Sequence, residues 1–207
     1  MSLPAAAVAT LSAWPAPTPG QEALRRGYLA HLAAQPRAVW KDGPPAHLTA
    51  SCFVLDPTGG AVLLTLHGKG KFWVQFGGHC EPQDTDLAAT ALREAREESG
   101  VADLRLLPGP VELNRHALSE AFGRCREHLD VAYVAVAARD TVPVVSPESD
   151  DVAWFDVDDL PDAVVTDLPG RLSAVLAAVS RDAPAQASTS VSAPGSGRSR
   201  AADRPSR

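Results

Sequence analysis

Residues 77–101 read GGHCEPQDTDLAATALREAREESGV, and the interpretation of the whole chain starts from this stretch. The two glycines at its start predict a turn, and Gly100 near its end predicts the end of a helix. Three carboxylates lie within five positions, and at 3.6 residues per turn Glu94, Glu97 and Glu98 share an arc of roughly 100°. Beside this arc, small and apolar residues recur at helical spacing and predict a face turned toward a core: Leu87, Ala88, Ala91, Leu92 and Ala95.

The acidic arc destabilises the helix that carries it, because like charges three or four residues apart cost roughly 0.2–0.5 kcal/mol per pair. Arg93 lies four residues before Glu97 and offsets part of this cost, whereas nothing comparable faces Glu94 and Glu98. Converging carboxylate oxygens are the ligands that hard divalent cations such as Mg²⁺ and Mn²⁺ prefer. A solvated acidic helix face is the alternative for three glutamates alone, but the glycines ahead of the helix favour a cation site.

With the glycines included, the stretch resembles the Nudix box, written G-x5-E-x7-R-E-U-x-E-E-x-G-U, where U is a bulky aliphatic residue. Gly78 matches the opening glycine, and the second half is in register through Arg93, Glu94, Glu97, Glu98, Gly100 and Val101. The chain departs from the box in its first half: Asp84 replaces glutamate, and eight residues rather than seven separate it from Arg93. Ala95 is also smaller than the usual aliphatic residue, and Gln83 stands where glycine is common.

In the family the first acid of the box pairs with the arginine and braces the loop. The resemblance therefore implies that Asp84 pairs with Arg93 across the inserted residue, with Glu81 as the next candidate. Arg93 is then expected to point away from the glutamate arc and to brace the loop rather than touch substrate.

The resemblance implies a Nudix-type α/β/α sandwich with a mixed β-sheet over roughly residues 47–162, and the order of predicted strands and helices agrees with it. It also implies a metal-dependent hydrolase that cleaves the diphosphate linkage of a nucleoside diphosphate derivative. The implied cofactor is Mg²⁺ or Mn²⁺, and the implied metal ligands are Gly78, through its carbonyl, with Glu94, Glu97 and Glu98.

The catalytic residues implied are Glu94, Arg93 and Glu148, the last in an acidic loop ahead of Trp154. An acid near Glu148 in relatives completes the metal site or acts as base, although a solvated acidic loop fits the sequence equally well. We favour Glu94 as the base because the motif fixes its position.

A non-catalytic, nucleotide-sensing Nudix-like domain is the alternative function, and the complete glutamate set favours the enzyme. A prenyl diphosphate isomerase is a weaker alternative, because its catalytic cysteine and glutamate cannot be placed in this sequence. Oxidised nucleotides, nucleotide sugars, dinucleoside polyphosphates and coenzyme A all suit the same motif, so the sequence does not select among these substrates.

The composition suits one globular domain with appendages: 207 residues, of which 45% are hydrophobic. A net charge of −6 argues against a stable nucleic-acid partner, which requires a basic face. Three cysteines without framework spacing favour the cytoplasm. No apolar run is long enough to span a membrane. A homodimer is compatible with these features.

Three regions follow from the order of the chain. Residues 1–20 are predicted to be a flexible lead-in, because they contain several prolines and no periodicity. Residues 21–182 form the predicted Nudix domain, with helices at 21–35 and 169–180 and strands at 48–56, 61–67, 72–76, 104–107, 111–116, 127–138 and 152–156. Residues 183–207 are predicted to be a disordered basic tail.

Two further groups of residues have side chains that could bind a ligand. His79, Cys80, His116, Cys125 and His128 suggest zinc, and Cys125-x2-His128 has a ligand-like gap, but no second pair follows at finger-like spacing, so zinc is disfavoured. Phe72, Trp73 and Arg124 are candidates for contact with a base or ribose, although one of the two aromatic residues is expected in the core.

Overall fold

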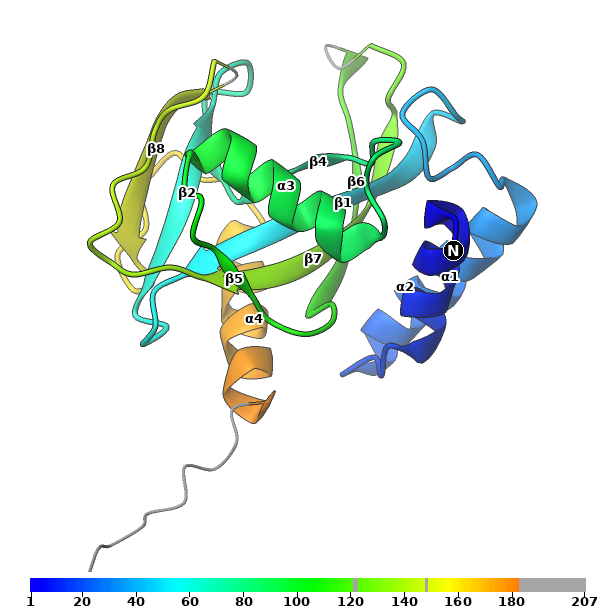
Figure 1. Ribbon diagram of the computed structural model, residues 1–207, viewed down its shortest axis with the longest axis horizontal. Helices are drawn as coiled ribbons and strands as arrows, with labels where there is room; N and C mark the ends of the chain where they lie inside the picture. The colour runs from blue at the N-terminus through cyan, green and yellow to red at the C-terminus, as the bar shows by residue number, and fades with distance from the viewer. Residues whose placement is uncertain (121–122, 148, 183–207) are drawn as a thin grey trace, which may run out of the picture.

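A mixed eight-stranded sheet forms the centre of the computed structural model, which describes residues 1–120, 123–147 and 149–182 (Figure 1). The strands are β1 (Ala46–Leu55), β2 (Ala61–His67), β3 (Trp73–Val74), β4 (Phe76–His79), β5 (Arg105–Leu106), β6 (Glu112–Ala117), β7 (Glu127–Val136) and β8 (Ser149–Asp156). Only β1 and β7 run parallel among the described strand pairs, over ten residues from Ala46 opposite Glu127 to Leu55 opposite Val136.

Strand β1 divides its second edge between two antiparallel partners. Its middle pairs with β4 from Thr49 to Cys52, and its end pairs with β2 at Val54 and Leu55. Strands β2 and β4 therefore pair with different segments of the same edge of β1. The chain leaves β4 toward helix α3 (Leu87–Ser99). The predicted turn at Gly77 and Gly78 is wrong: both glycines lie in β4, opposite Ser51 and Ala50.

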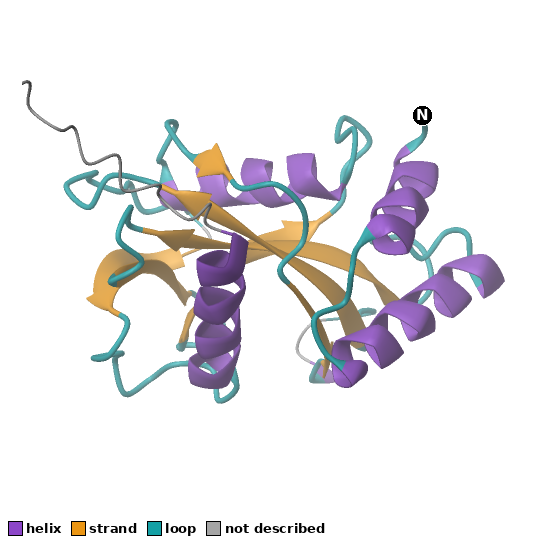
Figure 2. Cartoon of the chain, turned by 90° about the horizontal axis from the view of Figure 1, so that it is seen from below, coloured by secondary structure: helices purple, strands orange, loops and turns teal. Residues whose placement is uncertain are grey.

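Helices cover both faces of the sheet, as expected for an α/β/α sandwich (Figure 2). Helix α3 (Leu87–Ser99) crosses one face and α4 (Leu168–Asp182) the other. Two buried clusters result, one joining β1 and β7 to α3 and the other joining them to α4. This arrangement confirms the predicted fold class.

The N-terminal residues correct the prediction of a flexible lead-in. Residues 3–13 form α1 (Leu3–Ala13), which contacts α2 (Pro19–Ala34) and α3, and Leu3, Ala7 and Leu11 are buried. These residues recur every four positions, which is a helical stripe, and the alanines between them favour helix. Pro4 is tolerated because it lies in the first turn, where a backbone N–H has no partner within the helix.

The other predicted elements agree with the structure to within a few residues, except that the strand predicted at 72–76 is divided into β3 and β4 on either side of Gln75. Within the described ranges, no helix is both long and apolar enough to cross a membrane. The predicted tail at 183–207 and Glu148 lie outside the described residues.

Candidate functional site

Helix α3 presents the three glutamates toward β4. The Asp86 carboxylate accepts a hydrogen bond of 2.8 Å from the Ala89 N–H and begins the helix, and Gly100 ends it in the left-handed conformation with φ of 67°. Burial of Leu87, Ala91 and Ala95 fixes the rotation of the helix about its axis. The acidic arc therefore lies at the margin of the core, as predicted.

Two of the glutamates lie against the backbone of the paired glycines. A Cβ atom at Gly78 would lie 2.5 Å from Glu94 Oε1, so a side chain at this position would displace the carboxylate from its present place. The Gly77 N–H donates a hydrogen bond of 3.3 Å to Glu98 Oε2. Glu97 is different, because 59% of its side chain is exposed. Glu94 and Glu98 are thus held beside β4, and Glu97 faces solvent.

Asp84 pairs with Arg93, and this confirms the predicted contact despite the inserted residue. Arg93 Nε lies 2.9 Å from Asp84 Oδ1, and Arg93 Nη2 lies 2.9 Å from Oδ2. Asp84 Oδ2 also accepts hydrogen bonds of 2.9 Å from the Glu81 N–H and the Thr90 hydroxyl. Burial alone raises the pKa of Asp84, but these donors outweigh it and hold the pKa below its usual value.

Arg93 connects this pair to β4 and to the glutamates. Its Nη2 donates a hydrogen bond of 2.8 Å to the carbonyl of His79, the residue after Gly78. Its Nη1 lies 3.0 Å from Glu94 Oε1 and 3.0 Å from Glu97 Oε2. The expectations that Arg93 points away from the glutamates and that nothing faces Glu94 are therefore wrong: one guanidinium both holds the loop and bridges two of the acids.

Glu94 is the glutamate with the most perturbed chemistry. Burial raises its pKa to about 7, against the opposing effect of Arg93, and the nearby charges of Glu97 and Glu81 raise it further. A carboxylate in this position is costly to ionise in the metal-free protein. A cation bound to its oxygens would remove that cost, so the site favours a positively charged ligand.

The other residues singled out in the sequence are the aromatic pair Phe72 and Trp73, Arg124 and Glu148. Trp73 packs edge-on against Phe155, with ring centroids 4.7 Å apart, and lies partly buried against the core beside α4, so it is the member of the aromatic pair that packs on the core. Phe72 is half-buried with its ring 5.7 Å from that of His67, and Arg124 is exposed. Glu148 lies outside the described residues, and its role stays a prediction.

Sequence reasoning missed one group of ligand-type side chains. His47, His79, Cys125 and His128 lie with their ligand atoms within 4.8 Å of one another, at a place separate from the glutamates. The sequence suggests zinc for three of them, His79, Cys125 and His128, but no second pair of ligands follows at finger-like spacing. The missing ligand, His47, comes from β1, and only its pairing opposite His128 in β7 reveals the group.

Comparisons with known proteins agree with this fold. The family model described as NUDIX domain matches residues 45–176. A structure described as a hydrolase, NUDIX family, from Clostridium perfringens is 22% identical with a TM-score of 0.53 and covers 64% of this chain and 97% of its own. An Ap4A hydrolase binary complex from C. elegans is 16% identical with a TM-score of 0.54 and covers 65% and 98%. At these identities the likeness concerns the fold alone. No curated protein matches the chain.

Proposed function

Because this chain belongs to the Nudix family, we propose that it is a hydrolase that cleaves the diphosphate linkage of a nucleoside diphosphate derivative with the help of divalent cations. One observation carries the proposal: Glu94 is packed against the backbone of Gly78 while Arg93 and Glu98 tie the same strand to α3. A rigid strand beside a row of carboxylates suits a reaction in which charge must be positioned accurately.

The residues of this site fit Mg²⁺ or Mn²⁺. Carboxylate oxygens of Glu94, Glu97 and Glu98, with the carbonyl oxygen of Gly78, form the all-oxygen donor set that these hard cations prefer. The absence of a side chain at Gly78 keeps its backbone accessible beside Glu94. A divalent cation held there would neutralise diphosphate oxygens and lower the pKa of a bound water.

Arg93 acts in this proposal as a positioning residue. It holds the His79 carbonyl and so fixes the end of β4, and its Nη1 bridges Glu94 and Glu97 by donating a hydrogen bond of 3.0 Å to each carboxylate. A diphosphate carries its own negative charge, and the retained guanidinium limits the repulsion between that charge and the glutamates. The Asp84 carboxylate keeps Arg93 in this position.

Glu94 is our choice for the general base, and Glu148 is the alternative. Glu94 lies beside the Gly78 backbone, and its raised pKa in the metal-free protein is compatible with accepting a proton near neutrality. Metal affinity measured beside turnover separates the two for Glu94→Gln and Glu148→Gln. If Glu94 is both ligand and base, Glu94→Gln should lose turnover even at Mg²⁺ concentrations that saturate the weakened site, and this loss should shrink as pH rises. If Glu148→Gln behaves in this way and Glu94→Gln mainly loses metal, the assignment is reversed.

The experiment that tests the function is a screen of nucleoside diphosphate derivatives with Mg²⁺ or Mn²⁺, in which released phosphate products are measured. Glu97→Gln and Glu98→Gln should each lower turnover on the best substrate by about 100-fold or more, since each removes a proposed metal ligand. Glu22→Gln, in α2 and outside the site, is the matched control. Unchanged turnover in both site variants would overturn the proposal. Binding of a nucleotide without cleavage would favour a sensing domain.

A further inference from the structure

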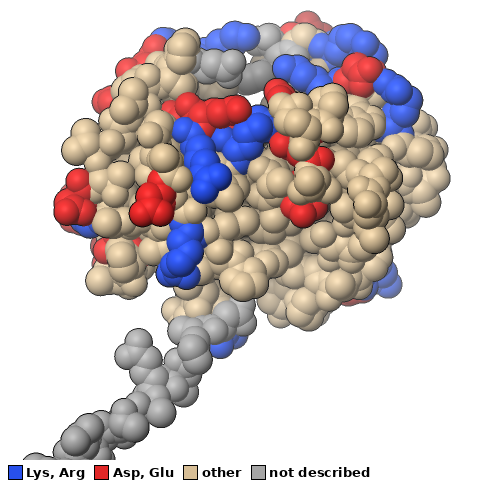
Figure 3. Space-filling model, in the orientation of Figure 1, with Lys and Arg blue, Asp and Glu red and all other residues tan. Residues whose placement is uncertain are grey.

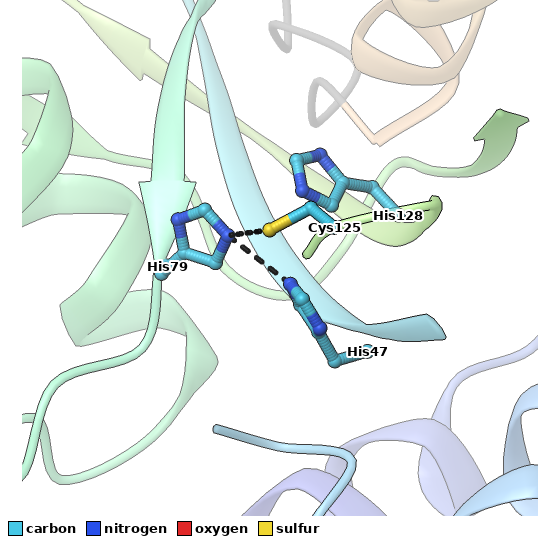
Figure 4. Close-up of side chains that lie close together, drawn as sticks. All are labelled: His47, His79, Cys125 and His128. Carbon is cyan, nitrogen blue, oxygen red and sulfur yellow. Dashed lines mark hydrogen bonds between the residues drawn. The ribbon is translucent and has the colours of Figure 1, made fainter. Parts of the chain in front are cut away.

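Three histidines and a cysteine converge beside the end of β4, on side chains that the proposed hydrolysis does not use. His47 and His128 are opposite each other on the parallel strands β1 and β7, and His79 ends β4 on the other edge of β1. Cys125 precedes β7 and is buried and free of any disulfide. Figure 4 shows the three rings and the thiol pointing toward one another.

The spacing of these groups is that of ligands around one tetrahedral ion. With metal–nitrogen bonds near 2.0–2.1 Å and a metal–sulfur bond near 2.3 Å, ligand atoms should be about 3.3 Å apart for two nitrogens and about 3.6 Å for nitrogen and sulfur. His79 Nε2 lies 3.1 Å from His47 Nε2 and 3.8 Å from Cys125 Sγ. All four ligand atoms lie within 4.8 Å of one another. Small adjustments of the side chains would therefore complete the coordination.

The three imidazole rings also form a nearly equilateral triangle. Their centroids are 5.1 Å apart for His47 and His79, 5.4 Å for His47 and His128, and 5.1 Å for His79 and His128. Rings bound to one tetrahedral ion through a nitrogen should have centroids about 5 Å apart, given the bond length above. The observed triangle matches this arrangement on every side.

The hydrogen bonds of His47 leave the lone pair of its Nε2 facing the cluster. His47 Nδ1 lies 2.8 Å from the Pro44 carbonyl, which can only accept, so Nδ1 donates its N–H and Nε2 is the nitrogen whose lone pair can bind a metal. A backbone carbonyl in this position typically orients a metal-bound histidine.

A cluster held by hydrogen bonds alone accounts for these contacts poorly. His79 Nε2 can donate its single proton to His47 or to Cys125, and His47 Nε2 can only accept. His128 Nε2 is buried without a hydrogen-bond partner within the described residues. Buried polar atoms without partners are rare in folded proteins and often mark a missing ion or water. A cation would satisfy all four groups at once.

We propose that His47, His79, Cys125 and His128 bind one Zn²⁺ ion, as a structural site distinct from the glutamates of α3. Nitrogen and sulfur ligands select Zn²⁺ over Mg²⁺, and four protein ligands leave no open position for chemistry. Cys125 releases its proton and binds as the thiolate. The negative charge of the thiolate offsets part of the charge of the ion. His79, Cys125 and His128 line a cavity of about 310 Å³, which gives the ion a path of entry.

The site would tie together segments that the polypeptide otherwise joins only through the sheet. His79 follows Gly78 directly, and its carbonyl accepts a hydrogen bond from Arg93. Zinc on the His79 ring would therefore fix the end of β4 from one face of the sheet, while Arg93 and Glu94 fix it from the other. The ion acts in this account on the position of the glycine backbone and not on substrate.

The test is metal binding by the chain of residues 1–207, with any affinity tag removed. The purified chain should contain one equivalent of Zn²⁺ that resists excess Mg²⁺, and the Co²⁺-substituted protein should give the absorption of tetrahedral Co²⁺ with a sulfur-to-metal charge-transfer band. Cys125→Ser should abolish that band, and His128→Asn should lower Zn²⁺ affinity by about 100-fold or more, since loss of an outer-shell partner alone costs 10–100-fold.

Two controls keep the outcome specific. His116→Asn alters a histidine that contacts the His128 ring but lies outside the four, and Glu97→Gln alters the other proposed metal site; both should retain zinc. Alkylation of Cys125 in the unmodified chain should be slowed by Zn²⁺, a measurement that needs no variant to fold. Absence of stoichiometric Zn²⁺, a Co²⁺ spectrum without the sulfur band, or no protection of Cys125 would each overturn the proposal.

Discussion

Removal of the Asp84 carboxylate tests whether its pair with Arg93 supports the loop ahead of α3. In Asp84→Ala the Arg93 guanidinium keeps Glu94, Glu97 and the His79 carbonyl as partners, and the Thr90 hydroxyl keeps the Asp86 carbonyl at 3.3 Å. The Arg93 Nε–H and the Glu81 N–H lose their acceptor. Two partly buried donors left without a partner cost about 2–4 kcal/mol in total.

The assay is urea unfolding of the wild type, Asp84→Ala, Arg93→Ala and the double variant. We expect the free energy of unfolding to fall by about 2–4 kcal/mol in Asp84→Ala, with a coupling energy between the two positions of about 1.5–3 kcal/mol. Asp42→Ala is the matched control, because Asp42 pairs with Arg37 at 2.6 Å while both side chains are about two-thirds exposed or more. It should cost no more than about 1 kcal/mol.

A coupling energy below about 0.5 kcal/mol would refute the reasoning, because it would mean that the two residues act independently. Turnover supplies a second reading of the same variant. Asp84→Ala should lower turnover even without urea and at low temperature, where the variant is fully folded. The reason is that Arg93, without Asp84, holds the His79 carbonyl less firmly. Normal turnover combined with the predicted loss of stability would limit the pair to a structural role.

Three further predictions follow from the same geometry. Burial raises the pKa of Glu94 from 4.5 to about 7, so between these pH values the folded protein holds a proton that the unfolded chain has released. Without metal, the free energy of unfolding should therefore fall by about 3 kcal/mol as pH rises from 4.5 to about 7. Urea unfolding of Glu94→Gln should lack that decline. Gly78→Ala places a Cβ against Glu94 and should lower turnover at least tenfold, whereas Gly27→Ala, with open space around it, should leave turnover unchanged; equal activities would contradict the packing. Leu11→Ala removes a fully buried side chain of α1 and should cost about 2–4 kcal/mol by urea unfolding, and a cost below about 1 kcal/mol would mean that α1 is not docked.

Periodicity in the sequence was enough to predict most of the fold. Helices α2 and α4 and strand β2 have apolar residues at the expected intervals, and Asp84 could be matched to Arg93 through the motif. Helix α1 was missed because prolines near it outweighed a stripe of only one buried residue per turn. Gly77 and Gly78 were read as a turn because glycine is rare inside strands, yet close packing on Ser51 and Glu94 requires glycine here.

The composition of the candidate site was predictable, but its contacts were not. Helical spacing placed Glu94, Glu97 and Glu98 on one arc and paired Arg93 with Glu97, but it could not reveal that the guanidinium also contacts Glu94. The histidine–cysteine group depends on strand register, since His47 and His128 meet only through the β1–β7 pair. On the face that Figure 3 shows, acidic and basic side chains are interspersed.

The parallel pairing of β1 with β7 also constrains the order in which the chain can fold. Each residue of β1 meets a partner about eighty positions later, and β1 has only two paired residues with its sequence neighbour β2. Loop closure on this scale must precede most of the favourable contacts, which predicts slow folding relative to proteins with local contacts. During synthesis, the central strand has no long partner until residue 136 has left the ribosome. Until then, the apolar faces of β1 remain uncovered by β7, and the nascent chain is exposed to aggregation.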